Sequence, residues 1–386
     1  MSVTAPAGFE ASGIRAGIKS SGTPDLALVV NRGPSNAAAA VFTSNRCKAN
    51  PILWSEQVIT DGRVSAVVLN SGGANCYTGA FGFQTTHATA EAVGEALDVS
   101  AGDVIVCSTG LIGVGDQTFR DAVVGGVPLA AAALTAESGA DAAVAIMTTD
   151  TRPKQSEHRS PDGWTIGGMA KGAGMLAPGL ATMLVVITTD ADLPSEALDR
   201  ALRAATRVTF DRLDSDGCMS TNDTVALLAS AASGVAPDES VFTAALTELC
   251  RDLALQLQGD AEGAGHDIAI EVVHAATEDE AVEAGRAVSR SNLFKAAVFG
   301  NDPNWGRVLA ALGTTAARFD PYAVDVSMNG VMICRTGEPY ESRDLVDLTP
   351  RAVHVLIDLK AGDATATVLT NDLTHDSVHE NSAYAS

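Results

Sequence analysis

A glycine-rich segment that runs directly into an apolar strand constrains this 386-residue chain more than any other feature. Residues 171–184 read KGAGMLAPGLATML, and the apolar run continues to Ile187. Glycine lets a backbone approach its neighbours closely and adopt positive φ, and a β-branched, aliphatic run is typical of a buried strand. Thr182 is therefore expected at the first position of a core strand that spans 182–187, after a pliable approach.

Two interpretations of Thr182 follow from the residues alone. The simpler one is a loop followed by a strand that happens to begin with threonine, a residue that favours strands. The other is that the chain cuts itself between Ala181 and Thr182, so that Thr182 becomes a new N-terminus. Its hydroxyl would then be the nucleophile of a reaction, and its freed α-amine would be the base.

Composition narrows the class of protein. The length suggests about two domains, and a hydrophobic content of 46% with a charged content of 19% indicates a folded chain. A formal net charge of −22 argues against nucleic acid as a partner, because phosphate binding needs a basic surface. The six cysteines are dispersed without a C-x-x-C pair, so neither a metal site nor disulfides are expected. We find no leader pattern and no membrane-spanning apolar run, and we expect a cytoplasmic protein.

Alternating strand and helix patterns predict an α/β protein of stacked helical and sheet layers. Strands are expected at 26–30, 37–43, 65–70, 103–108, 164–169, 182–187, 268–274, 323–328, 353–358 and 363–370. Helices are expected at 83–97, 127–148, 193–208, 241–258, 277–290 and from Pro303 onward. Residues 152–163 are typical of a loop, and the polar tail 380–386 is by default disordered.

Three polar stretches are candidates for chemistry. Thr109-Gly110 ends a predicted strand and offers a hydroxyl beside an unencumbered backbone N–H, the donors that acyl transfer needs where negative charge develops; a simple turn is the alternative. Thr148 and Asp150 can end a helix. The oxygen-rich stretch 211–224 suits a hard cation, but it lacks the glycine and the terminal glutamate of a calcium loop, so a hydrogen-bonded loop is expected.

Segment 171–184 resembles the ornithine acetyltransferase (glutamate N-acetyltransferase) family of arginine biosynthesis, whose pattern there is K-G-A-G-M-x-x-P-x-x-A-T-M-L. Similar motifs recur at 70–75 (NSGGAN), 220–224 (STNDT) and 301–307 (NDPNWGR). The resemblance implies a self-cleaving enzyme with an N-terminal threonine nucleophile. It also implies the layered architecture of DmpA and ornithine acetyltransferases, with two subdomains. Residues 1–181 would form an α chain and residues 182–386 a β chain, assembled as a heterotetramer of two α and two β chains.

The resemblance also implies roles for individual residues. Thr182 would take the acetyl group from N-acetylornithine, Thr109 and Gly110 would form the oxyanion hole, and glutamate would accept the acetyl group in a ping-pong reaction. The residues that would bind substrate are Thr148, Lys171, Thr182, Glu262, Asn381 and Ser386. No cofactor or metal is implied. Acetyl-CoA is an additional candidate donor of the acetyl group. Two physiological roles stay open: a step of arginine biosynthesis, or the role of a relative that acts in an antibiotic-type pathway.

The sequence departs from the family pattern at two places, and two rival functions remain. Residues 114–117 (VGDQ) stand where the family usually has Leu-Pro, and Ser377 stands where it commonly has tyrosine, which bears on the anchoring of the tail. One rival is a self-cleaving aminopeptidase or amide hydrolase with water as acceptor. The other is a catalytically silent amino-acid-binding protein. Lys171, Glu262 and Asn381 together favour an amino-acid acceptor, whereas an intact chain would favour the binding protein.

Overall fold

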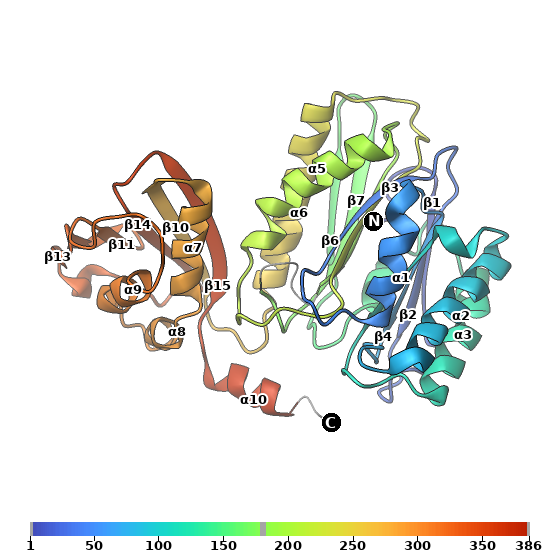
Figure 1. Cartoon of the computed structure of the whole chain (residues 1–386), viewed down its shortest axis with the longest axis horizontal. Helices are drawn as coiled ribbons and strands as arrows, with labels where there is room; N and C mark the ends of the chain where they lie inside the picture. Colours follow the sequence, from blue (N-terminus) through green and yellow to red (C-terminus); the bar gives the residue numbers. More distant parts are fainter. Residues whose placement is uncertain (1–2, 178–182, 384–386) are drawn as a thin grey trace. The chain divides into compact units, whose positions relative to one another are not determined.

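The computed structural model describes residues 3–177 and 183–383, which form two compact units (Figure 1). Unit 1 contains the described residues of 1–173, 179–211 and 219–257. Unit 2 contains those of 174–178, 212–218 and 258–386. The layered α/β class with two subdomains is confirmed. No helix within these described ranges is long and apolar enough to cross a membrane.

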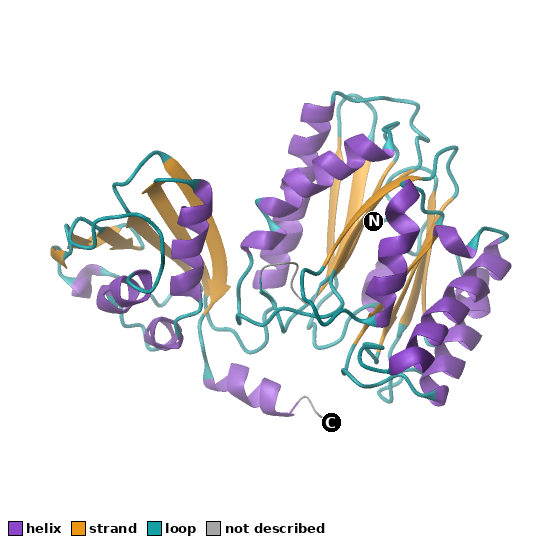
Figure 2. Cartoon of the chain, in the orientation of Figure 1, coloured by secondary structure: helices purple, strands orange, loops and turns teal. Residues whose placement is uncertain are grey.

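Two sheets form the centre of unit 1 (Figure 2). The first has the order β1 (Phe9–Ile14), β2 (Leu26–Asn31), β4 (Ala66–Ser71) and β5 (Val104–Thr109). The second has the order β3 (Ala37–Phe42), β9 (Thr224–Ala229), β8 (Leu184–Thr189), β7 (Thr165–Lys171) and β6 (Lys154–Arg159). In the second sheet β7 and β8 are antiparallel, with Lys171 opposite Leu184, whereas β8 and β9 are parallel.

Alternation along the strands explains the layers of unit 1, because successive side chains of a strand point to opposite faces. In β2, Ala27 and Val29 pack into the core between the two sheets, while Leu26 and Leu28 pack outward under helices. The helices over the first sheet are α2 (Gly79–Leu97) and α3 (Gln117–Ala132). Those over the second sheet are α5 (Ser195–Arg207) and α6 (Glu239–Gln258). Unit 1 is thus a helix–sheet–sheet–helix sandwich.

Two short helices complete unit 1. Helix α1 (Asn50–Val58) packs against β5 and α2. Helix α4 (Gly139–Ala145) contacts β1 and β2 and contributes Ala142 and Ala145 to the core between the sheets. The small side chains of α4 let a helix fit at this place.

Unit 2 has one sheet with helices on one face. The strand order is β13 (Glu338–Pro339), β12 (Val331–Arg335), β11 (Asp325–Met328), β14 (Ala352–Asp358), β10 (Asp267–Ala275) and β15 (Ala364–Asn371). The helices that share its core are α7 (Glu278–Ser289), α8 (Asn292–Phe299) and α9 (Trp305–Leu312). Buried Ile268 and Ile270 alternate with half-exposed neighbours in β10. Helix α10 (His375–Ala383) follows β15.

Several predicted elements differ from those observed. The helix expected at 127–148 is two helices, because Thr135 leaves the helix to exchange both backbone hydrogen bonds with Ala11 at 2.9 and 3.1 Å. The loop expected at 152–163 contains β6, which pairs with β7 at the edge of the sheet in the described part of the chain. The tail is helical from His375 to Ala383. The strand expected from Thr182 is described from Leu184 onward, and Thr182 itself lies outside the described residues.

Candidate active site

Thr109 and Gly110 lie where β5 ends against the turn that follows β4. The Thr109 carbonyl accepts hydrogen bonds from Gly72 N (2.9 Å) and Gly73 N (3.0 Å). Gly110 has φ +129°, and a Cβ placed there would lie 2.6 Å from Gly73 N. Only glycine therefore fits at position 110 without displacing the turn. The pair is held rigidly, as a site that must receive a developing charge requires.

The polar turn 70–75 supports this pair. Asn70 Nδ2 donates to Gly73 O (3.1 Å), and Asn70 Oδ1 accepts from Ser108 Oγ (2.6 Å). Asn75 Nδ2 donates to Gly82 O (2.9 Å). Both amide side chains are thus engaged within the fold, and the turn serves as scaffold.

A two-residue bridge joins the end of β5 to the start of β8. Asn222 Nδ2 donates to Ser108 O (2.8 Å) and Ala74 O (2.7 Å), and the neighbouring Asp223 Oδ1 accepts from Met183 N (3.0 Å). Burial raises the pKa of Asp223 well above its ordinary value, against the opposing effects of the Met183 N–H, nearby hydroxyls and Lys171. The bridge therefore fixes the residue that directly follows Thr182 relative to the strand that ends in Thr109.

The hydrogen-bonded loop expected at 211–224 is confirmed in its second half, where Ser220, Thr221, Asn222 and Asp223 are buried. Asn222 N donates to Ser220 Oγ (3.1 Å), and Thr221 Oγ1 donates to Asn222 Oδ1 (2.6 Å). Among residues 3–177 and 183–383, the structure contains no group of His, Cys, Asp or Glu side chains that could hold a metal ion.

Lys171, at the end of β7, is buried beside Thr148. Its Nζ donates to Thr148 Oγ1 (3.3 Å). Asp150 accepts from Gly172 N (2.7 Å) and from Lys154 Nζ (2.5 Å). Burial raises the pKa of Asp150, but Lys171, Lys154 and the Gly172 N–H outweigh burial and hold it below its ordinary value. The cluster therefore combines a carboxylate with two buried ammonium groups, and its surplus positive charge suits a carboxylate ligand.

Two lysines of this region were missed by sequence reasoning. Lys154 lies in β6, which was expected to be a loop. Lys19 Nζ donates to Met147 O (2.6 Å) across 128 residues of chain, and burial lowers the pKa of Lys19 despite nearby Asp25 and Asp150. The contact of Lys19 joins segments far apart in the chain, so no local pattern signals it. Lys154 lies only four residues from its partner Asp150, and it was missed because β6 was expected to be a loop.

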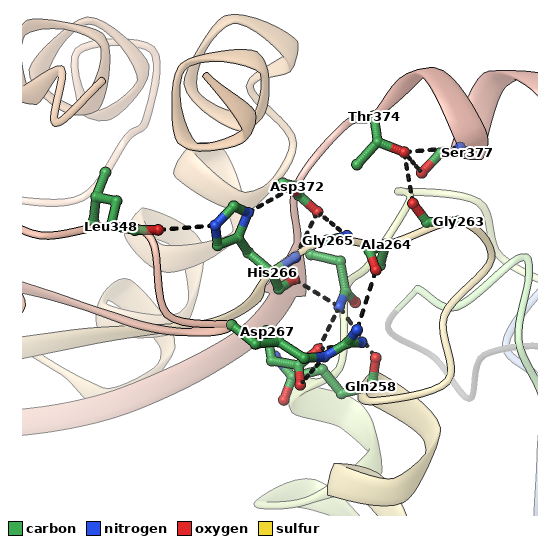
Figure 3. A network of polar contacts seen from close by, with 12 residues as sticks. Gln258, Gly263, Ala264, Gly265, His266, Asp267, Leu348, Asp372, Thr374 and Ser377 are labelled. Atoms are coloured by element: carbon green, nitrogen blue, oxygen red, sulfur yellow. Dashed lines mark hydrogen bonds and ion pairs between the residues drawn. The ribbon is translucent and has the colours of Figure 1, made fainter. Parts of the chain in front are cut away.

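In unit 2, the loop that carries Glu262 anchors the tail helix (Figure 3). Thr374 Oγ1 donates to Gly263 O (2.6 Å) and accepts from Ser377 N (2.9 Å) at the start of α10. A Cβ on Gly263 would lie 2.3 Å from Ser377 N, so the close approach depends on glycine. The anchoring of the tail thus uses the backbone and the hydroxyl of Ser377, and needs no tyrosine there.

The remaining predicted residues lie in unit 2 or outside the described residues. Asn381 is exposed in the last turn of α10, where its Nδ2 donates to Ser377 O (2.9 Å). Glu262 is half-buried, and a Cβ on Gly174 would lie 2.5 Å from Glu262 Oε2. Ala181, Thr182 and Ser386 lie outside the described residues.

A buried histidine that the sequence did not single out holds the same loop (Figure 3). His266 Nδ1 lies 2.7 Å from Asp372 Oδ2, and His266 Nε2 lies 2.9 Å from Leu348 O. Asp372 Oδ1 also accepts from Gly265 N (2.8 Å) and His266 N (2.9 Å). Both ring nitrogens of His266 therefore lie within hydrogen-bond distance of an acceptor oxygen. The contact ties the loop before β10 to the segment after β15.

The sandwich of unit 1, with its rigid Thr-Gly pair and buried lysine cluster, defines a layered α/β enzyme. Comparison with known families matches residues 10–386 to the ArgJ family. The chain belongs to this family, as the sequence motifs predicted.

Two curated relatives match this chain over its whole length, and one solved structure matches about half of it. "Arginine biosynthesis bifunctional protein ArgJ" of Streptomyces coelicolor is 64% identical over 386 residues, which is all of both chains. The protein of that name from Thermobifida fusca is 58% identical over 385 residues, again covering both chains. A crystal structure of ornithine acetyltransferase complexed with ornithine, from Mycobacterium tuberculosis, is 54% identical. It covers 47% of this chain and 96% of its own, with a TM-score of 0.45.

Proposed function

We propose that this enzyme transfers the acetyl group of N-acetylornithine to glutamate and releases ornithine and N-acetylglutamate. The observation that carries the proposal is the Asn222–Asp223 bridge. It ties the strand that ends in Thr109-Gly110 to Met183, the residue after Thr182, so that a nucleophile at position 182 would be covalently attached to a fixed residue. The membership in the ArgJ family and the names of the relatives support the same reaction.

The active enzyme would form by self-cleavage between Ala181 and Thr182. The Thr182 hydroxyl adds to the Ala181 carbonyl carbon, the peptide C–N bond breaks, and the nitrogen leaves as the free α-amine of Thr182. Water then hydrolyses the resulting ester, which yields residues 1–181 with a carboxylate and residues 182–386 with a free hydroxyl. The antiparallel pairing of β7 with β8 supports a product in which both fragments remain in one sheet.

Acetyl transfer would reuse the same hydroxyl in two steps. The free α-amine has a reference pKa of about 7.7–8, so it can take the hydroxyl proton near neutral pH. The oxygen attacks the acetyl carbonyl, Thr109 and Gly110 stabilise the oxyanion, and ornithine departs with the proton. The amine of glutamate then attacks the acetyl ester, which regenerates the hydroxyl and gives N-acetylglutamate.

Substrate would be held at both of its charged ends. The surplus positive charge around Lys171, beside Thr148, supports binding of an amino-acid carboxylate. Glu262 would bind an amino group, and we assign Asn381 and Ser386 to substrate binding on the family resemblance. We extend the proposal in three ways. Acetyl-CoA would serve as a second acetyl donor. The enzyme would be cytoplasmic, and it would assemble from two α and two β chains.

The decisive experiment is to trap the acetyl group. Cleaved enzyme incubated with N-acetylornithine, but without glutamate, should gain one acetyl mass on the fragment that begins with Thr182. Glutamate should discharge it quickly as N-acetylglutamate, and water only slowly. Intact mass and peptide mapping provide the measurement, and acetyl-CoA in place of N-acetylornithine tests the second donor.

Variants make the trapping experiment specific. Thr182→Ala should neither cleave nor become labelled, whereas Thr349→Ala, at an exposed threonine, should do both. A label on another residue would overturn the assignment of the nucleophile. Loss of the label that glutamate does not accelerate would instead favour the amide hydrolase, with water as acceptor.

A further inference from the structure

A loop near the N-terminus connects two parts of the candidate site within unit 1. The loop, residues 15–25, joins β1 to β2, and it packs on the turn that follows β4. A Cβ placed on Gly72 would lie 2.8 Å from Ile18 Cγ2 and 3.3 Å from Lys19 Cγ. The N–H of Gly72 is bonded to the carbonyl of Thr109, so the loop packs directly on the turn that supports Thr109.

Asp25 fixes the shape of this loop. Its buried carboxylate accepts three backbone hydrogen bonds, from Ala16 N (2.6 Å), Ile18 N (2.7 Å) and Lys19 N (3.0 Å). The carbonyl of Asp25 also accepts from the N–H of Ser71 (2.9 Å), which is the last residue of β4. A buried carboxylate is retained in a fold when such donors satisfy it. The backbone of Lys19 is therefore held in place next to β4.

The peptide between Met147 and Thr148 is held at both ends by opposite charges. Lys19 Nζ donates to its carbonyl oxygen, Met147 O (2.6 Å). The N–H of the same peptide, which belongs to Thr148, donates to Asp150 Oδ2 (3.0 Å). The ammonium thus faces the negative end of the peptide dipole, and the carboxylate faces its positive end. This peptide sets the direction in which the Thr148 side chain leaves the backbone toward Lys171 Nζ.

We propose that Lys19 is a positioning residue for substrate binding, because its ammonium orients the Met147–Thr148 peptide so that Thr148 and Lys171 bind the substrate carboxylate together. The proposal rests on the function proposed above and deepens it. A site whose peptide is already oriented loses little freedom when substrate binds, so the effect belongs to KM and not to kcat. Ping-pong exchange uses one site twice, and both amino acids should therefore depend on Lys19.

Two variants of Lys19 separate the ammonium from the rest of the side chain. Lys19→Met keeps the length of the side chain, but it removes the contacts to Met147 O and, within the loop, to Pro24 O (3.0 Å). Lys19→Arg keeps the charge and the ability to donate to a carbonyl. Lys48 offers a matched control in unit 1, since it is likewise half-buried and its Nζ contacts Glu56 Oε1 (2.5 Å).

Steady-state kinetics of the cleaved enzyme provide the main measurement, with N-acetylornithine and glutamate each varied in turn. Lys19→Met should raise KM for both amino acids about tenfold, since a hydrogen bond to a charged group is lost. Its kcat should stay within about twofold of the wild type, because the oxyanion donors are unchanged. Lys19→Arg should recover most of the lost affinity, and Lys48→Met should match the wild type in both constants.

A second readout tests whether Lys19 acts through the substrate carboxylate. Isoglutamine, the α-amide of glutamate, lacks the α-carboxylate charge, and its inhibition constant against glutamate measures binding without that charge. The wild type should bind isoglutamine more weakly than glutamate. In Lys19→Met this preference should shrink several-fold, because two changes that remove the same interaction are not additive.

The outcomes separate the two proposals. If the wild type transfers no acetyl group between the two amino acids, the proposed function fails and the role of Lys19 falls with it. If the wild type does transfer it, and Lys19→Met keeps both KM values or the full preference over isoglutamine, the positioning role is refuted while the function stands. If Lys19→Met loses kcat, KM and melting temperature together and Lys19→Arg restores none of them, Lys19 is a general structural support and the proposal is likewise refuted.

Discussion

At the scale of single residues, the Thr109-Gly110 pair shows how backbone geometry restricts chemistry. The positive φ of Gly110 and its contact with Gly73 leave no room for a side chain. Thr109 can be changed more gently, because valine has nearly the shape of threonine and also favours strands. The hydroxyl can therefore be tested without disturbing the turn.

We predict that Thr109→Val slows acetyl transfer and leaves KM nearly unchanged. The loss of one oxyanion donor typically removes about 2.7–4 kcal/mol of transition-state stabilisation. Steady-state kinetics of the cleaved enzyme measure this, with melting temperature as the control for folding. Normal turnover with a raised KM would instead make Thr109 a turn residue that contacts substrate weakly.

Lys295 gives a prediction for the pH dependence of stability. Burial lowers the pKa of Lys295 to about 8, from 10.5 for the ordinary side chain. Between these values the unfolded chain binds more protons than the folded one, so the free energy of unfolding rises with pH. From pH 8 to 10.5 the rise due to Lys295 should approach about 3 kcal/mol.

The measurement compares urea unfolding of the wild type and Lys295→Met from pH 7 to 10.5. Subtraction removes the titration of groups that the two proteins share. The difference between their unfolding free energies should shift in favour of the wild type as pH rises. A constant difference across this range would mean that Lys295 keeps its ordinary pKa in the folded state.

At the scale of elements, buried strands could be predicted from the sequence and edge strands could not. The expected strands at 26–30 and 65–70 are apolar on both faces and correspond to β2 and β4. Strand β6 reads KQSEHR, has no apolar alternation, and is a strand only because β7 pairs with it. The break between α3 and α4 likewise depends on Ala11, more than a hundred residues away.

Some residues of the candidate site could likewise be predicted from the sequence, and others could not. Thr109, Gly110, Thr148 and Lys171 stand in recognisable local motifs, and the structure places Thr148 and Lys171 in contact. Lys154 contacts Asp150, only four residues away, and it was missed because its strand, β6, reads as a loop. Lys19 carries no local signal, since its contact with Met147 O joins segments 128 residues apart. The pairing of His266 with Asp372 is of the same kind, because about a hundred residues separate the partners.

That pairing yields a prediction for the element that carries Glu262. Asp372→Ala removes the acceptor of three donors from Gly265 and His266 and leaves the ring without its partner. Leaving buried hydrogen-bond donors without their acceptor typically costs about 1–3 kcal/mol of unfolding free energy for each group. Urea unfolding measures the loss, which should be smaller in Asp372→Asn. Asp363→Ala, at an exposed aspartate, should change stability little, and an equal loss there would contradict the prediction.

At the scale of the whole chain, the second sheet of unit 1 interleaves the two proposed fragments. Its order is β3-β9-β8-β7-β6. Strands β3, β7 and β6 belong to residues 1–181, and β9 and β8 belong to residues 182–386. The two strands of the second fragment therefore form the middle of the sheet, with strands of the first fragment on both sides.

We expect the cleaved fragments to stay together in the absence of denaturant. Size-exclusion chromatography should give a single species with equimolar fragments, and for the proposed heterotetramer it should elute at twice the mass of one chain. Since association of two chains depends on concentration, the melting temperature of the cleaved enzyme should fall on dilution. The uncut Thr182→Ala chain controls for oligomer effects. Separation of the wild-type fragments under native conditions would contradict the sheet pairing described here.

The interleaved sheet also orders the events of biogenesis. Without its partner, the fragment that begins at Thr182 would present β8 and β9 with open edges on both sides, and such edges invite aggregation. A ribosome has to deliver the first 229 residues before β9 can enter the sheet. Maturation would therefore run in one direction, from a complete polypeptide to a folded precursor and only then to two chains. Cleavage would occur only in chains that have already folded.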